Sequence, residues 1–279
     1  MMTVIEGRWK ADSMNLRSVL VTGGGSGIGA ALAQVLASRG CEVLISGRRR
    51  DKLDSVASTS NRITICVGDV NDPAHRQELA AKLSILPEPR AVFHGAGYFQ
   101  AGRLNDLSQA DWRRSFETNV EARWALSRDC ADLLLGGRLL FIGSDAGANP
   151  RPGAAAYSIA QAASETLRRA LQAEWADRDT AVGGFKPGLV DTDMVRGFMA
   201  MPEKDFPSRS VYEQYMSNGQ IVGPEVIACF AAWLLLDVSA SRFSETEWDI
   251  RDVDHQPEWH EGALYPESAT SNPGDPDEH

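Results

Sequence analysis

Residues 19–32 read VLVTGGGSGIGAAL, and this short stretch already indicates the fold of the chain. Its first residues are apolar or β-branched and predict a strand, whereas the residues from Gly27 onward predict a helix. Gly23, Gly27 and Gly29 stand where the strand passes into the helix, and glycines there let the turn tighten and the backbone approach a pyrophosphate. Because a helix N-terminus offers N–H groups and a positive dipole to phosphates, the stretch predicts a βα unit that binds a dinucleotide.

The same order of strand and helix repeats along the chain. Short apolar runs predict strands at 17–22, 42–46, 62–67, 91–97, 137–144, 181–188 and 246–252. Helical patterns are found at 27–40, 73–86, 108–135, 154–178 and 223–237. Regular βαβ alternation predicts an α/β fold of the Rossmann type: one doubly wound, mostly parallel sheet with helices on both faces, in a single domain.

Composition favours a cytoplasmic globular protein. The chain has 279 residues, 43% of them hydrophobic, which is enough for one sizeable core. Its four cysteines have no metal-site or redox spacing and are expected to be reduced thiols. Residues 1–18 lack the apolar core of a signal peptide, and the longest apolar run, 226–236, is too short to cross a bilayer.

The charge is unevenly distributed. The net charge is −10, and the residues from Glu245 onward, with eleven acidic residues and one arginine, account for all of it. The neutral remainder offers no surface for nucleic acid or an anionic membrane. We therefore expect an N-terminal extension at 1–16, a folded body at 17–252 and an acidic extension at 253–279. That extension is expected to be partly disordered, above all in the polar stretch 267–279.

Between residues 193 and 222 the alternation breaks. Methionines, phenylalanines and tyrosines occur there among prolines, glycines and charges. One interpretation is a surface excursion packed by its own side chains. The other is a mobile lid over an apolar substrate.

Further motifs extend the picture, and together they resemble the classical short-chain dehydrogenase/reductases over about Arg17 to Asp252. They are TGGGSGIG at 22–29, VGDV at 67–70, HGAG at 94–97, FETNVEA at 116–122, a serine thirteen residues before Tyr157, and KPGLVDT at 186–192. The resemblance implies a nicotinamide dinucleotide cofactor. It implies that the cofactor is contacted by Thr22, Gly23, Gly25, Ser26, Gly27, Ile28, Gly29, Asp69, Val70, Gly95, Ala96, Gly97, Tyr157, Gln161, Pro187, Gly188, Val190 and Thr192.

The end of the second predicted strand bears on the choice of cofactor. An NAD enzyme needs an acid there for the ribose 2′-hydroxyl, but the residue is Gly47, and three arginines follow it. Guanidinium groups suit a 2′-phosphate, so we predict NADP(H) rather than NAD(H), with Arg48 as the first contact and Arg49 as the next. The alternative is that these arginines only begin a solvated helix.

The resemblance also implies the catalytic residues. Tyr157 would exchange a proton with the substrate oxygen, Ser144 would orient that oxygen, and Asn119 would support a water. Gln161 stands where the family has a lysine, and it can bond a ribose hydroxyl but supplies no charge. Because a free tyrosine has a pKa near ~10, a protonated Tyr157 favours reduction over oxidation.

Three weaker candidates complete the set. Lys186 could reach toward Tyr157 and replace the missing charge, or it could point to solvent or a carboxylate. The cluster DVDHQPEWHE at 252–261 has no defensible metal spacing, so it is read as solvated surface, and no metal is expected. His94, on a buried strand end, is expected to be a hydrogen-bonded core residue.

The sequence thus favours an NADP(H)-dependent oxidoreductase that interconverts a carbonyl and an alcohol on a small or medium, partly apolar substrate, mainly by reduction. A non-catalytic or regulatory NADP(H)-binding protein of the same fold is the alternative, and a different reaction on the same scaffold stays open. The long helices favour a homodimer or homotetramer, as is common in the family.

Overall fold

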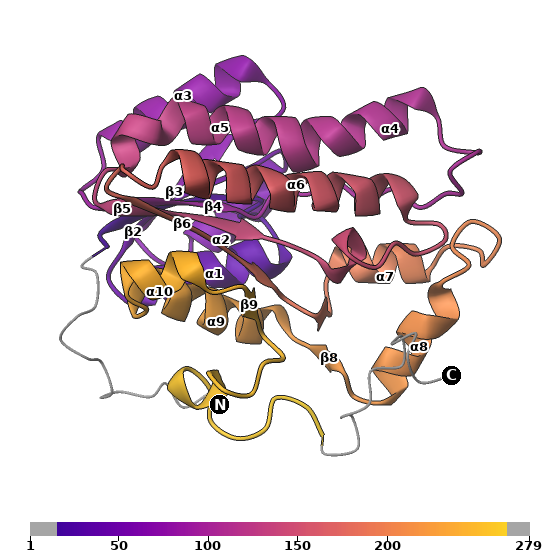
Figure 1. Cartoon of the computed structure of the whole chain (residues 1–279). Coiled ribbons are helices and arrows are strands. Elements are labelled where there is room, and N and C mark those ends of the chain that lie inside the picture. The colour runs from indigo at the N-terminus through magenta and orange to yellow at the C-terminus, as the bar shows by residue number, and fades with distance from the viewer. Residues whose placement is uncertain (1–15, 267–279) are drawn as a thin grey trace.

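The computed structural model describes residues 16–266. Its centre is a sheet of seven strands, all parallel, in the order β3-β2-β1-β4-β5-β6-β9 (Figure 1). The strands are β1 (Ser18–Thr22), β2 (Glu42–Gly47), β3 (Ile63–Val67), β4 (Arg90–His94), β5 (Gly137–Ile142), β6 (Thr180–Lys186) and β9 (Trp248–Asp249). The predicted doubly wound α/β fold is confirmed.

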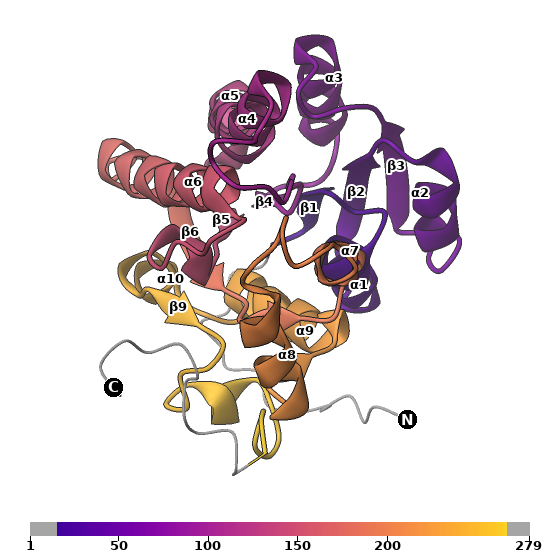
Figure 2. The same ribbon diagram turned by 90° about the vertical axis from the view of Figure 1, so that its right-hand side faces the viewer.

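Helices cover both faces of this sheet (Figures 1 and 2). One face carries α1 (Gly27–Ser38) and α9 (Pro224–Leu236), which pack against each other. The other carries α3 (Pro73–Ser84), α5 (Ala122–Cys130) and α6 (Ala155–Glu174). The remaining helices are α2 (Arg50–Ala57), α4 (Gln109–Phe116), α7 (Asp193–Met199), α8 (Arg209–Ser217) and α10 (Ala240–Glu245), and a small second sheet joins β7 (Leu189–Val190) to β8 (Ile221–Val222).

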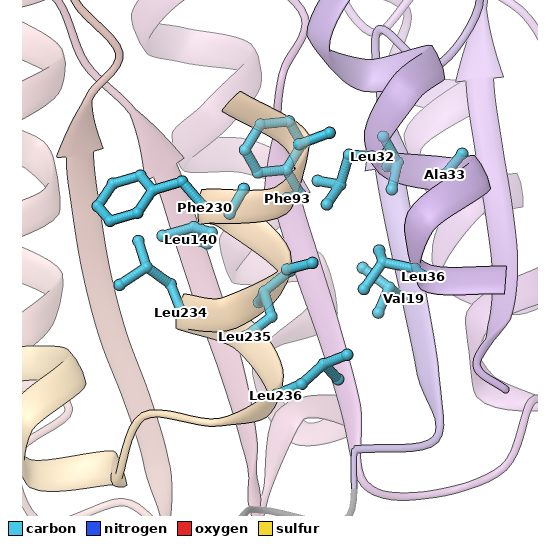
Figure 3. Close-up of a cluster of buried hydrophobic side chains, with 14 of the residues drawn as sticks. Val19, Leu32, Ala33, Leu36, Phe93, Leu140, Phe230, Leu234, Leu235 and Leu236 are labelled. Carbon is cyan, nitrogen blue, oxygen red and sulfur yellow. The ribbon is translucent and has the colours of Figure 1, made fainter. Parts of the chain in front are cut away.

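The core has two layers because strand side chains alternate between the faces. Val19 and Val21 point toward α1 and α9, where they join a cluster that includes Leu36 and Phe230 (Figure 3). Leu20, between them, points to the other layer, under α3, α5 and α6. Strands buried on both faces explain the near-continuous apolar runs of the sequence.

The region predicted as one helix at 108–135 is a rod of several segments. A π-helical turn, Glu117–Glu121, separates α4 from α5, and a 3₁₀ turn at Ala131–Leu134 follows α5. π turns are rare and occur often at functional sites. Asn119, one of the predicted site residues, lies in this turn.

The folded body continues past Asp252, the boundary expected from the sequence. His255 and Trp259 are buried, and the His255 ring stacks on Phe230 with 5.2 Å between centroids. The Trp259 indole N–H donates to His255 Nδ1 (3.0 Å), so Nε2 donates to the Asp249 carbonyl (2.9 Å). The interpretation of 252–261 as solvated surface is therefore wrong for His255, because aromatic packing outweighs the acidic composition. The expectations for 1–15 and 267–279 lie outside the described residues.

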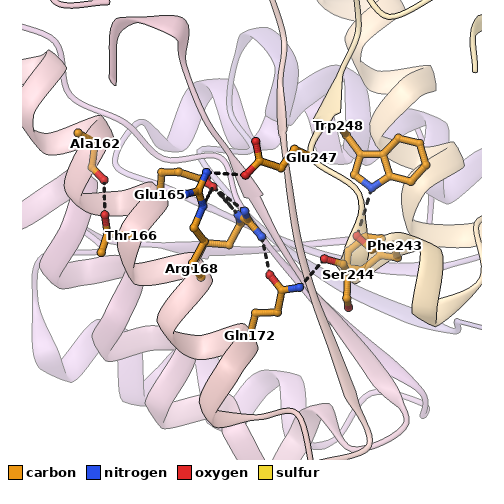
Figure 4. Close-up of polar contacts among 10 residues, drawn as sticks. Ala162, Glu165, Thr166, Arg168, Gln172, Phe243, Ser244, Glu247 and Trp248 are labelled. Atoms are coloured by element: carbon orange, nitrogen blue, oxygen red, sulfur yellow. Dashed lines mark hydrogen bonds and ion pairs between the residues drawn. The ribbon is translucent and has the colours of Figure 1, made fainter. Parts of the chain in front are cut away.

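A polar network fixes the C-terminal half of α6. The buried Arg168 guanidinium pairs with Glu165 and donates to Gln172 Oε1 (2.9 Å) (Figure 4). Gln172 in turn donates to the Ser244 carbonyl in α10 (2.5 Å), and Arg169 pairs with Glu247 just before β9. These contacts anchor the C-terminal half of α6 to α10 and to the segment before β9.

Candidate active site

A cleft of about 930 Å³ opens at the carboxyl ends of β1, β4, β5 and β6. In doubly wound sheets this edge, where the strand order reverses beside β1, is the usual ligand site. Every predicted site residue except Asn119 is among the described residues that line the cleft. The cleft thus brings together residues from Thr22 to Thr192 that lie far apart in the sequence.

The glycine turn forms one end of the cleft. Gly23 has a φ of +72°, and a Cβ there would lie 2.8 Å from the Gly95 carbonyl group. A Cβ at Gly29 would lie 2.4 Å from the Gly23 oxygen, so only glycine lets α1 start this close to the turn. Thr22 Oγ1 accepts from the Gly95 and Ala96 amides at 3.1 and 3.2 Å. The turn is therefore tied to the end of β4, and the α1 N-terminus faces the cleft.

The arginines after β2 lie beside this turn. Arg49 Nη2 donates to Ser26 Oγ (2.9 Å), and Arg48 Nη1 lies 3.9 Å from an Asp69 carboxylate oxygen. Both arginines are exposed and line the cleft, whereas Arg50 begins α2. The two guanidinium groups and the Ser26 hydroxyl beside Gly47 are groups that can bind a phosphate.

Tyr157 and Ser144 meet at the other end of the cleft. Tyr157 lies in the first turn of α6, and Ser144 follows β5. Burial raises the pKa of Tyr157 above its ordinary value of 10, while the Ser144 hydroxyl, the charge of Arg123 and the Gln161 amide, in that order, act to lower it. The net rise keeps the phenol protonated at neutral pH, so Tyr157 can act as a proton donor.

Asn119 lies behind the cleft rather than in it. Its Oδ1 accepts from the Tyr98 amide (3.0 Å) and its Nδ2 donates to the Tyr98 carbonyl (2.8 Å). The side chain is fully buried and its polar atoms are used by these bonds. Asn119 therefore holds the loop after β4 against the π turn, and its side chain positions that loop.

Arg123 is a cleft residue that the sequence reading missed. It lies one helical turn after Asn119, is 3% exposed and lines the cleft with Tyr157 and Gln161. Asn119, Arg123 and Ser127 have the i, i+4 spacing of one helix face. The signal in the sequence that could have identified Arg123 is a charged residue four positions after the predicted site residue Asn119, on the same helix face.

Lys186 does not supply the charge near Tyr157. Its strand position pairs with Asp249 of β9. Burial acts to raise the pKa of Asp249, and the bonds and charge of Arg251, with a smaller contribution from the charge of Lys186, lower it. Among the described residues, the charged group that acts on the pKa of Tyr157 is Arg123. The charge of Lys186 thus acts on Asp249 rather than on Tyr157.

The region 193–222 packs on itself and also lines the cleft. Phe198 contacts Phe206 and Tyr212, each with 4.9 Å between ring centroids. Phe99 joins this cluster to Tyr157, whose ring centroid is 5.2 Å away. The Arg151 guanidinium lies 5.7 Å from the Tyr212 ring centroid. The packing of the region on itself agrees with the first sequence interpretation, and the mobile lid stays a prediction. Figure 2 views its helices, α7 and α8, from the side where they lie.

The C-terminal segment adds a wall that the sequence did not predict. Ala263 to Pro266 line the cleft, and the Tyr265 hydroxyl lies 3.1 Å from the position that a Cβ at Gly188 would take. Arg251 ties the start of this segment to the loop after Ser144 by donating to Asp145 Oδ1 (2.8 Å).

We expect Tyr265→Ala to weaken cofactor binding by roughly 3–10-fold, because Tyr265 covers the predicted nicotinamide end of the cleft and one lost contact is worth about 1 kcal/mol. Fluorescence titration with NADPH measures this. Asp254→Ala, an exposed change in the same segment that does not line the cleft, is the matched control. Equal affinities for the two variants would show that Tyr265 does not touch the cofactor.

The histidines away from the cleft have structural partners. His94 Nε2 hydrogen-bonds Ser127 Oγ (2.8 Å), and burial lowers its pKa well below 6.5, as suits the predicted core histidine. Cys66, His75 and Glu78 bring three possible metal ligands within 4.8 Å of one another. However, His75 Nε2 bonds Ser46, and burial raises the pKa of Cys66 to about 11, which favours the protonated thiol. The expectation of no metal stays a prediction.

Comparisons with known proteins show the family of the chain. A family model described as short chain dehydrogenase matches residues 17–203. Galactitol 2-dehydrogenase of Rhizobium johnstonii is 31% identical over 196 residues, which are 66% of this chain and 76% of that protein. Tetrahydroxynaphthalene reductase of Pyricularia oryzae is 28% identical over 233 residues, 80% of this chain and 77% of that protein.

A solved structure agrees as well. It is a candidate NAD(P)-dependent gluconate 5-dehydrogenase from Beutenbergia cavernae, with NADP bound at low occupancy. It superposes with a TM-score of 0.72 at 27% identity, over 84% of this chain and 93% of that chain. Among residues 16–266, no helix is both long and apolar enough to cross a membrane.

Proposed function

Because the chain belongs to the short-chain dehydrogenase family, we propose that it is an NADP(H)-dependent oxidoreductase that interconverts a carbonyl and an alcohol, mainly by reduction. The observation that carries the proposal is a buried, protonated Tyr157 beside Ser144 in a cleft that also contains the glycine turn. The two arginines after β2 and the lack of an acid at Gly47 support NADP(H).

The residues at the glycine turn fit a dinucleotide. Gly27 has a φ of +52°, and a Cβ there would lie 3.3 Å from the Thr192 methyl, in the space that a cofactor would need. Arg48 and Arg49 would hold the 2′-phosphate, and the α1 N-terminus would hold the pyrophosphate. When bound, the reduced cofactor supplies a hydride to the carbonyl carbon.

The chain's own residues do the rest of the chemistry. Ser144 donates a hydrogen bond to the carbonyl oxygen and orients it. Tyr157 donates its hydroxyl proton to that oxygen, so the O–H bond of the alcohol forms as the phenol O–H bond breaks. The apolar side chains over Tyr157 exclude water from the reacting atoms.

The cleft favours a small or medium, partly apolar substrate. Phe99, Phe198 and Tyr212 surround the outer side of Tyr157, and Arg151 lies over the Tyr212 ring. Such a pocket suits a flat or apolar carbon skeleton better than a fully hydroxylated polyol. A polar or anionic substituent could be held by Arg151.

Oligomerisation is also proposed. Trp124 on α5 and Ile159 on α6 are exposed although both are large apolar residues. Exposed apolar side chains on neighbouring helices support a homodimer or homotetramer. The four cysteines are all free thiols, three of them buried, which supports the cytoplasm as its location.

The test is to titrate the full chain with NADPH and NADH by fluorescence. The loss of reduced-nicotinamide absorbance is then followed with a panel of ketones, aldehydes and diketones. We expect tighter binding of NADPH and turnover with at least one aromatic or apolar carbonyl compound. NADPH binding without turnover across the panel would instead support a regulatory nucleotide-binding protein.

A further inference from the structure

Arg123 is held at the centre of the cleft by bonds to three neighbouring elements. Its Nη1 donates to the Ile142 carbonyl at the end of β5 and to Ser164 Oγ in α6, both at 2.9 Å. Its Nη2 reaches the Ala96 carbonyl in the loop after β4 at 3.4 Å. These partners fix the guanidinium between the loop after β4 and the two elements that carry Ser144 and Tyr157.

This guanidinium is a buried cation without a carboxylate partner among residues 16–266. No acidic side chain of the described chain lies within ion-pair distance of it, and its Nε has no hydrogen-bond partner there. The buried Arg168 pairs with Glu165, whereas the buried Arg138 is held, like Arg123, by backbone carbonyls. Burying an unpaired charge destabilises a protein, and Arg123, unlike Arg138, lines the cleft.

Two titratable groups have a charge interaction with Arg123. One is His94, whose pKa burial and the charge of Arg123 lower well below 6.5, so that its ring is neutral at neutral pH, and the other is Tyr157. Burial lowers the pKa of Arg123 to about 10, which still leaves it a cation at neutral pH, and its interaction with Tyr157 is mutual. The other groups facing Tyr157 are neutral: Ser144 from the loop after β5, Gln161 from its own helix and Tyr212 from α8. Arg123 is therefore the positive charge that acts on the phenol.

The residue at position 161 agrees with this arrangement. Gln161 is 4% exposed, and its Oε1 has no hydrogen-bond partner in the described chain. Ser164, which Arg123 binds, lies three residues later on the same helix. An ammonium group at position 161 would face the Arg123 guanidinium at short range, and like charges buried together repel.

We propose that Arg123, which lies on α5 rather than on α6, is the active-site cation of this protein. It stabilises the negative charge left on the Tyr157 oxygen when the phenol proton passes to the substrate. The inference rests on the proposed function. Arg123 acts through Tyr157 and is a positioning residue, and Gln161 is the neutral neighbour that its charge requires. The chain thus keeps a complete proton-transfer site without a lysine at position 161.

The test removes the positive charge at position 123 on α5 and places a positive charge at position 161 on α6. Arg123→Gln keeps amide donors for the neighbouring carbonyls but removes the charge, and we expect it to lower turnover roughly 10–100-fold, as loss of a cation near a tyrosine predicts. Arg123→Lys is expected to recover most of the loss. The double variant Arg123→Gln/Gln161→Lys is expected to regain at least tenfold over Arg123→Gln, whereas additive losses would overturn the proposal.

A second readout does not depend on the reaction. The full chain is labelled with 3-fluorotyrosine, and the Tyr157 resonance is identified by its loss in Tyr157→Phe. Its ¹⁹F titration is expected to begin at a higher pH in Arg123→Gln than in the wild type, and to return toward wild type in Arg123→Lys and in the double variant. An unchanged titration in folded Arg123→Gln would refute the inference even if the proposed function is right, and the titration tests Arg123 even if that function is wrong.

If Arg123→Gln does not fold, the single variant Gln161→Lys tests the proposal instead. With Arg123 in place, a second cation is expected to lower the melting temperature and to leave turnover at or below the wild-type value. A tenfold gain in turnover from Gln161→Lys would mean that the wild-type site lacks a cation, and the proposal would be wrong.

Discussion

Replacing Tyr157 with phenylalanine is expected to lower kcat/KM for carbonyl reduction by roughly 10²–10⁴-fold, the usual contribution of a general acid. The change removes the hydroxyl that gives its proton to the substrate oxygen and keeps the ring that packs against Phe99. Steady-state rates with the best substrate of the carbonyl panel measure the loss. NADPH affinity, followed by fluorescence, is expected to change by less than about threefold, because most cofactor contacts lie elsewhere in the cleft.

Tyr212→Phe is the matched control. Tyr212 also lines the cleft, and burial raises its pKa to about 12, but it belongs to the region over the substrate rather than to the pair with Ser144. Its hydroxyl is expected to matter less than tenfold. If Tyr212→Phe lost the activity and Tyr157→Phe kept more than a tenth of it, the proton donor would be Tyr212 and the proposed mechanism would be wrong.

Local patterns were enough to predict the fold. The inner strands of the parallel sheet are buried on both faces, so apolar runs mark them directly, and glycines at 23–29 mark a turn that must approach a ligand. The site residues drawn from those turns converge because the carboxyl ends of parallel strands share one edge. That physical rule, rather than any single motif, explains why 21 predicted residues spread over the chain line one cleft.

Side-chain partners could not be read in the same way. The sequence shows Gln161 and Lys186 beside known motifs, but not that the charge of Lys186 acts on Asp249 or that Arg123 enters from another helix. The acidic composition also led to a wrong prediction near the C-terminus, where 252–261 was interpreted as solvated surface. Net charge describes solvation, whereas His255 and Trp259 are placed by aromatic packing against α9 and β9.

Cofactor preference is the second large effect. We expect Gly47→Asp combined with Arg49→Ala to shift the NADPH/NADH ratio of kcat/KM toward NADH by roughly 10³-fold. The aspartate would accept from a ribose 2′-hydroxyl and repel a 2′-phosphate, and the loss of Arg49 removes one charge-assisted bond, each effect being worth about 10–100-fold. There is room for the side chain, because a Cβ at Gly47 would make only an ordinary 3.6 Å contact with Leu53.

The control variant Arg50→Ala shows whether the change in cofactor preference depends on which arginine is removed. Arg50 lies next to the proposed phosphate site but faces Asp54 within α2 and does not line the cleft, so its loss should leave the cofactor ratio within about twofold of wild type. An equal loss of NADPH preference in Arg50→Ala would point to the general positive field of three arginines. An unchanged ratio in the Gly47→Asp/Arg49→Ala variant would mean that the 2′-phosphate is not bound between β2 and the glycine turn. The contrast between neighbouring arginines therefore separates a built phosphate site from the start of a solvated helix.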